Sequence, residues 1–140
     1  MIRAAHRLRV VEAVMALTVV GVVLAVLPFR LVARLAGRVE ASVQACPPPT
    51  VDATAAAVGR SVEAAARRLP WRPACLEQAL AASLMLRRRG VPSHLCIGVA
   101  TGDRRDFRAH AWVTAAGGTV CGGAAAAGMT PIAAFRPQGK

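Results

Sequence analysis

The chain of 140 residues is long enough for one domain and too short for two sizeable hydrophobic cores. Its formal net charge is +11, from 17 Arg and one Lys against seven acidic residues. Such an excess attracts acidic partners, but the arginines are scattered in short clusters, and only three Phe and two Trp could stack on bases. We therefore expect one domain with an N-terminal appendage, and no nucleic-acid partner.

Four widely spaced cysteines argue against a zinc site, and nothing in their spacing demands disulfides. Cys46, Cys75, Cys96 and Cys121 include no C-x-x-C pair, and no paired histidines stand at metal-ligand spacing. Zinc ligands in proteins come in such short-spaced pairs. We expect no metal and no cofactor.

Residues 1–40 are predicted to form a hydrophobic and basic N-terminal helical segment. It contains 17 successive uncharged residues, Ala13 to Phe29, at the lower limit for a membrane span, with arginines on both sides. Three placements stay open: a helix packed on the domain, a helix on the inner membrane surface through residues 10–38, or a single span. No small-residue cleavage site follows, so we expect a cytoplasmic protein, peripheral to the inner face of the membrane in the second case.

Residues 41–50 are predicted to be a proline-rich linker, because three successive prolines cannot continue a helix. The core domain is then 51–140. Apolar residues at steps of three and four predict a helix from about Val51 to Leu69, capped by Thr50 or Asp52 and ended by Pro70.

A second helix is predicted from about Pro73 to the arginine cluster at 87–89, with Gly90 as its C-terminal cap. Alternating patterns then predict strands over 93–100, 108–114 and 119–123, the second with Arg108, His110, Trp112 and Thr114 on one face. Helices followed by strands indicate an α+β fold with a small antiparallel sheet.

Cys75 and His110 are the clearest candidates for catalytic residues. Cys75 lies in the first turn of a predicted helix, where the positive helix end lowers a thiol pKa and free N–H groups can stabilise an oxyanion. His110, on a predicted strand 35 residues later, can serve as its base. Spacing alone leaves open that Cys75 is a small buried packing residue.

Several longer runs of the sequence also resemble a known protein family. The runs "WRPACLEQALAASLMLRRRGVPSHLCIGVA" and "FRAHAWVTAAGGTV" resemble the transglutaminase-like leader peptidases of lasso-peptide biosynthesis, in their stand-alone protease form. The opening "RLRVVEAVMAL" and "LPFRLVARLAG" are similar to that family's N-terminal helix, and "IAAFRP" to its C-terminal strand.

The resemblance implies a transglutaminase- and papain-like core and a cysteine peptidase with Cys75 as nucleophile and His110 as base. It implies removal of the leader from a ribosomally made precursor peptide. The partners it implies are a small leader-binding protein and a separate ATP-dependent cyclase, which closes the freed core peptide.

The third catalytic position departs from the family pattern. The resemblance places an aspartate about a dozen residues after His110, where this chain reads Thr119 to Gly123, and no Asp or Glu follows Asp106. A Cys-His pair depends less on such an acid than a Ser-His pair does. We expect a neutral group around Thr119 to Gly122 to orient His110, and Gly122→Asp to retain or raise activity.

Two tryptophans, Trp71 and Trp112, are candidates for the walls of a substrate cleft, with core packing as the alternative. Two other function classes stay open. One is a non-catalytic or pseudoenzyme scaffold at the membrane surface in the same pathway. The other is acyl transfer by the same Cys-His pair, for which the sequence offers no acyl-CoA signature.

Overall fold

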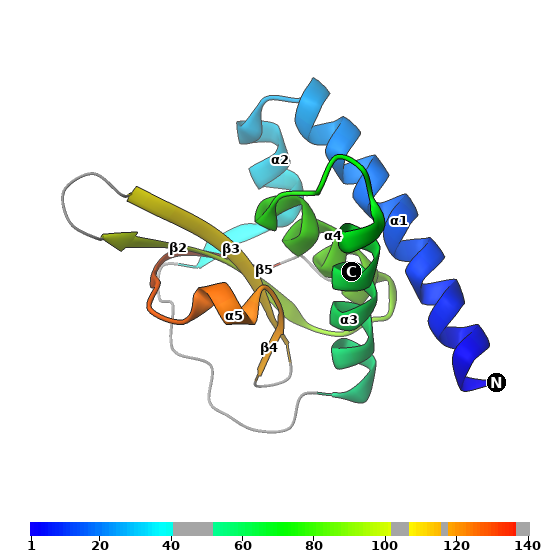
Figure 1. Ribbon diagram of the computed structural model, residues 1–140. Helices are drawn as coiled ribbons and strands as arrows, with labels where there is room; N and C mark the ends of the chain where they lie inside the picture. Colours follow the sequence, from blue (N-terminus) through cyan, green and yellow to red (C-terminus); the bar gives the residue numbers. More distant parts are fainter. Residues whose placement is uncertain (41–51, 102–106, 116–117, 137–140) are drawn as a thin grey trace.

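A computed structural model describes residues 1–40, 52–101, 107–115 and 118–136. The described chain contains five helices and five strands (Figure 1). The helices are α1 (Ile2–Val26), α2 (Phe29–Ala36), α3 (Ala53–Arg68), α4 (Cys75–Arg88) and α5 (Gly123–Ala126). The strands are β1 (Arg38–Glu40), β2 (Ser93–Thr101), β3 (Phe107–Ala115), β4 (Gly118–Cys121) and β5 (Thr130–Arg136).

The strands form one antiparallel sheet in the order β1-β5-β2-β3-β4. One face packs against α1, α3 and α4 in the main hydrophobic cluster, to which β2, β3 and β5 contribute Leu95, Ala111, Val113 and Phe135. The opposite face carries a smaller cluster of Cys96, Trp112 and Ala134, beside α5 (Figure 1). The predicted α+β class, with helices followed by a small antiparallel sheet, is confirmed.

The N-terminal segment forms two helices rather than one. Pro28 has no N–H to donate and takes an extended backbone conformation between α1 and α2, as the N-cap of α2. One face of α1 packs on the domain, where Ala13 and Leu17 are fully buried. By length and composition α1 could cross a membrane, but the core helix of a soluble protein passes the same test.

Residues 38–40 of this segment form β1, which pairs with β5 at the sheet edge. The division of the chain at residues 40 and 50 stays a prediction, and the predicted linker 41–50 lies outside the described residues.

The two central helices follow the predicted patterns. Asp52 caps α3 by accepting a hydrogen bond from the N–H of Ala55 at 3.4 Å. After α4 ends, Gly90 adopts a φ of 69°, which favours glycine. The sequence patterns missed the four-residue α5 and the three-residue β1, whereas β5 includes residues 132–136 of the stretch for which the resemblance implied a C-terminal strand.

Small residues let the helices lie close to the sheet. Five of the seven buried residues of α3 are Ala, Gly or Ser, and the other two are Val58 and Val62. At Gly59 a Cβ atom would overlap the carbonyl oxygen of Val120 and come within 2.8 Å of its carbonyl carbon. The backbone of α3 therefore rests directly on the backbone of β4.

This contact predicts that Gly59→Ala destabilises the fold, although alanine normally favours a helix. We expect the free energy of unfolding to fall by about 2 kcal/mol, a typical cost of overpacking. Gly21→Ala is the matched control, because nothing lies within 4 Å of its Cβ position in α1. That variant should be neutral or more stable by up to about 1 kcal/mol. Urea unfolding of the two variants measures both effects, and equal stabilities would contradict the close contact.

Candidate active site

Cys75 is the first residue of α4, preceded by a strained turn. The N-cap, Ala74, has no side-chain cap, so the first N–H groups of α4 have no intrahelical partner. Arg72 has a φ of 46°, in the left-handed region, immediately before Pro73. Such a conformation costs a non-glycine residue about 1–2 kcal/mol. The amide of Gln78 steadies the turn by donating to the carbonyl oxygen of Pro73 at 2.9 Å.

The free N–H groups give this helix end the character expected of an oxyanion site. The Cys75 side chain is half-buried and packs against the main hydrophobic cluster. Within the same turn, Oε2 of Glu77 is buried without a hydrogen-bond partner among the described residues. The first turn of α4 therefore contains both a partly accessible thiol and an unsatisfied carboxylate oxygen.

His110 is held by a backbone carbonyl. Its Nε2 lies 2.9 Å from the carbonyl oxygen of Gly122. A carbonyl oxygen only accepts, so Nε2 carries the hydrogen, and in the neutral ring Nδ1 has the free lone pair. The group that fixes the ring is therefore neutral, and it leaves Nδ1 available to take a proton.

Gly122 forms this contact from a conformation suited to glycine. Its φ is +79°, and a Cβ atom there would lie 3.1 Å from Nε2 of His110 and 3.0 Å from the carbonyl oxygen of Ala111. These separations are tighter than ordinary van der Waals contacts. The backbone approaches the ring closely because no side chain stands between them.

Trp112 lies next to His110 on the same face of β3, as the alternation predicted. The two rings are nearly parallel, with centroids 6.2 Å apart and an interplanar angle of 15°. The Trp112 ring covers Gly98 of β2, where a Cβ would come within 2.7 Å of it. Trp112 is buried in the smaller cluster, whereas Trp71 is 49 % exposed before α4.

A broad open hollow of about 640 Å³ borders His110. Its lining is mostly small and apolar, with Arg108 as the one charged side chain among its described residues. Three alanines of the α5 region and Met129 form part of it, and Cys75 does not. The sequence patterns missed this hollow because they missed α5; the only signal was the alanine run after Gly123.

Cys75 and His110 are not hydrogen-bonded to each other in the described structure. Cys75 packs against the main cluster, which includes Ala111 and Val113, whereas His110 lies beside the smaller cluster on the opposite face of β3. The structure thus brings together His110, Trp112 and Gly122, and it leaves Cys75 apart from them. The catalytic roles of Cys75 and His110 stay predictions.

Among the described residues, no group of three or more His, Cys, Asp or Glu side chains is placed to hold a metal ion. Cys96 and Cys121 are buried, and burial raises the pKa of the Cys121 thiol to about 12, with a further contribution from Glu63. Asp103, Asp106 and Cys46 lie outside the described residues.

The family model of the transglutaminase-like superfamily matches residues 23–134. The match covers most of the chain, so the protein belongs to this superfamily. No curated protein and no solved structure shows a significant match to the chain.

The close contact between Gly122 and His110 affects what a side chain at position 122 would do. The sequence predicts that Gly122→Asp retains or raises activity, but any Cβ atom there would crowd the imidazole of His110. Gly122→Ala measures that cost alone and should lower the activity roughly ten- to a hundredfold by displacing the ring. Gly122→Asp should be more active than the isosteric Gly122→Asn, because a carboxylate stabilises the imidazolium form. Activity is measured as cleavage of a precursor peptide, and an Asn variant as active as the Asp variant would contradict a role for negative charge here.

Proposed function

We propose that the protein is a cysteine peptidase that removes the leader from a ribosomally synthesised lasso-peptide precursor. The observation that carries this proposal is the hydrogen bond between His110 Nε2 and Gly122. It holds the ring in the tautomer that a general base needs, at the sequence position where the resembled family has its aspartate. The uncapped start of α4, with Cys75 as its first residue, supplies the second half of the site.

In the proposed reaction His110 Nδ1 takes the thiol proton, and the Cys75 thiolate attacks the carbonyl carbon of the scissile peptide bond. The free N–H groups of α4 stabilise the oxyanion. The C–N bond then breaks, and the imidazolium returns its proton to the amine of the departing core peptide. The leader remains as a thioester on Cys75 until water, deprotonated by His110, hydrolyses it.

This reaction requires Cys75 and His110 to meet, and they are not hydrogen-bonded without substrate. Because Cys75 packs against the main cluster and His110 stacks on Trp112 on the other face of β3, the two side chains can meet only if the imidazole or the start of α4 moves. We infer that the precursor, presented by a small leader-binding protein, brings the two side chains together. The core peptide then passes to an ATP-dependent cyclase, and the reaction takes place in the cytoplasm.

Substitution of either residue tests the proposal. Cys75→Ala and His110→Ala should each lower precursor cleavage by at least about 1,000-fold, as the loss of a member of a catalytic pair does. Cys96→Ala is the matched control, since Cys96 is a buried thiol in the smaller cluster, and it should keep most of the activity. Cleavage is followed by mass spectrometry with the leader-binding protein present, and cleavage by folded Cys75→Ala would refute the proposal.

The alternative is a non-catalytic scaffold or pseudoenzyme in the same pathway. It is favoured by the separation of Cys75 from His110, and by the absence of a carboxylate hydrogen-bonded to His110 within the described residues.

Thiol alkylation near neutral pH distinguishes the two. Cys121, with its pKa raised to about 12, stays protonated and should react slowly. An active peptidase should alkylate at Cys75 at least about tenfold faster than at the other cysteines, and equal rates at Cys75 and Cys96 would favour the scaffold.

A further inference from the structure

The outer face of α1 carries a continuous apolar stripe. Six large apolar side chains follow one another at steps of three or four residues, so they lie along one side of the helix. Each is between 53 and 73 % exposed. They are Leu8, Val11, Met15, Val19, Val22 and Val26, and we call them the outer stripe.

The outer stripe is distinct from the face by which α1 packs on the domain. The packed face contributes Ala13, Leu17 and Val20 to the main cluster. The most apolar 18-residue window within Arg3–Val26 has a mean hydropathy of 2.2, yet only 22 % of that window is buried. A helix that is apolar on all sides is normally covered on all sides. In Figure 1 α1 runs along one side of the molecule, and no other described element covers its far side.

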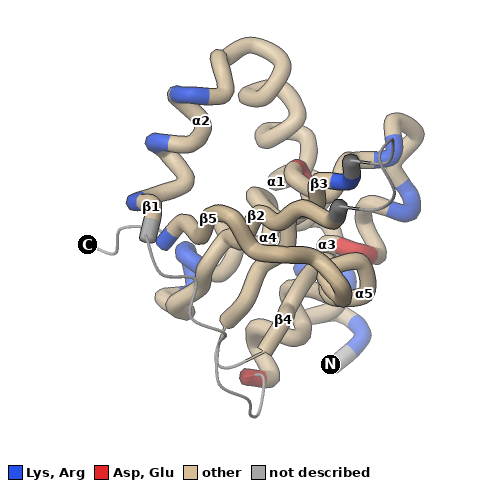
Figure 2. Tube along the Cα trace, turned by 90° about the vertical axis from the view of Figure 1, so that its left-hand side faces the viewer, with Lys and Arg blue, Asp and Glu red and all other residues tan. Residues whose placement is uncertain are grey.

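The surroundings of the outer stripe are strongly basic. Arg3 and Arg7 precede it, and Arg30 and Arg34 follow it on α2; all four are exposed. Figure 2 shows the basic residues of α2 along one edge of the molecule. The sole acidic residue of residues 1–36 is Glu12, and Arg88 and Arg89 of α4 already neutralise it. The stripe is therefore flanked by positive charge without an acidic counterpart.

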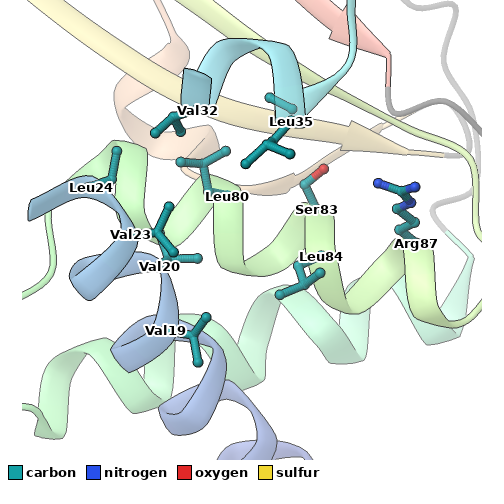
Figure 3. Close-up of a pocket in the computed structure, with 11 residues that line it drawn as sticks. Val19, Val20, Val23, Leu24, Val32, Leu35, Leu80, Ser83, Leu84 and Arg87 are labelled. Carbon is teal, nitrogen blue, oxygen red and sulfur yellow. The ribbon is translucent and has the colours of Figure 1, made fainter. Parts of the chain in front are cut away.

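An apolar groove widens this surface toward α2 and α4. It holds about 240 Å³ and is lined by valines and leucines, with Ser83 and Arg87 as its polar members (Figure 3). Val19 belongs both to the groove and to the outer stripe. Leu35 and Leu84 at the groove are 66 and 40 % exposed, and Arg87 adds another exposed cation at its edge.

We propose that the outer stripe rests on an anionic lipid leaflet, with α1 parallel to the membrane plane. The stripe enters the boundary between headgroups and acyl chains, and the flanking arginines contact lipid phosphates.

Two contacts favour a helix lying on the membrane over one crossing it. Ala13 and Leu17 are fully buried against the domain, and Glu12 accepts hydrogen bonds from both terminal nitrogens of Arg89, one of them at 3.0 Å. These bonds lower the pKa of Glu12, so it is ionised at neutral pH. A crossing helix would lose this packing and carry Glu12 toward the lipid interior.

Charge also favours lipid over a second copy of the chain. A dimer through the outer stripe would bring two sets of flanking arginines together, and like charges at an interface oppose association. An anionic leaflet instead matches both the apolar and the basic parts of the surface. The inference concerns binding alone and does not depend on peptidase activity.

Flotation of the full chain with vesicles tests the proposal. The protein should float with phosphatidylcholine vesicles that contain phosphatidylglycerol and remain largely unbound with phosphatidylcholine alone. Added salt should weaken the binding by screening the arginines. Met15→Glu with Val22→Glu should lower the bound fraction at least about tenfold, since both side chains would leave the lipid. Thr130→Glu with Ile132→Glu, at exposed positions of β5, adds the same charge elsewhere and should change binding less than about twofold.

A second pair of substitutions leaves the outer stripe intact. Arg30→Gln with Arg34→Gln should weaken binding to the anionic vesicles and flatten its salt dependence. Thermal unfolding at the same temperature as the wild type would show that each variant keeps the fold. The proposal is overturned if the wild type binds neither kind of vesicle, or if the stripe and control variants bind alike. It also fails if sedimentation without lipid shows a dimer that the stripe variant loses.

Discussion

The direct contact between α3 and β4 at Gly59 is the constraint on which the site depends. Because Gly59 has no side chain, α3 presses on the backbone at Val120, and this fixes β4 against the helical layer. Two residues later the chain turns at Gly122, and its carbonyl oxygen reaches His110 on β3. The position of the imidazole therefore follows from helix-to-sheet packing some distance away. This is how a short sheet can orient a histidine through its backbone.

Much of the fold could be predicted from the sequence, because the relevant signals are local. The three- and four-residue steps of α3 and α4, the Asp52 cap and the alternation around Trp112 all depend on neighbours along the chain. The missed elements depend on distant ones: β1 exists only by pairing with β5, and α5 is a single turn made of residues without a strong pattern. In the N-terminal segment, Pro28 indicates where the helix breaks. The packing of α1 on the domain has no such local signal.

The candidate site also has features that local patterns predict and features that depend on packing. Cys75 at a helix start and His110 on a strand follow from local patterns and from the resemblance. The hydrogen-bond partner of His110 could be confined only to a stretch of residues, because a backbone carbonyl has no signature in the amino-acid types. Cys75 packs against the main cluster and His110 stacks on Trp112 of the smaller one, an arrangement that depends on the packed sheet and that sequence spacing cannot predict.

The outer stripe and the hollow beside His110 lie on different sides of the sheet. The outer stripe belongs to the helical layer, whereas the hollow beside His110 lies with α5 on the other face. A protein resting on lipid through α1 would therefore leave this hollow accessible to a peptide.

The central claim is that Cys75 forms the covalent bond to the leader. The most direct measurement is mass spectrometry of the protein after brief reaction with precursor and acid quenching, followed by peptide mapping. The account predicts an adduct on the Cys75 peptide with the mass of the leader fragment less one water, as a thioester requires. Two results would contradict it: continued cleavage with the adduct on another residue, and continued cleavage with no adduct at all under conditions that slow thioester hydrolysis.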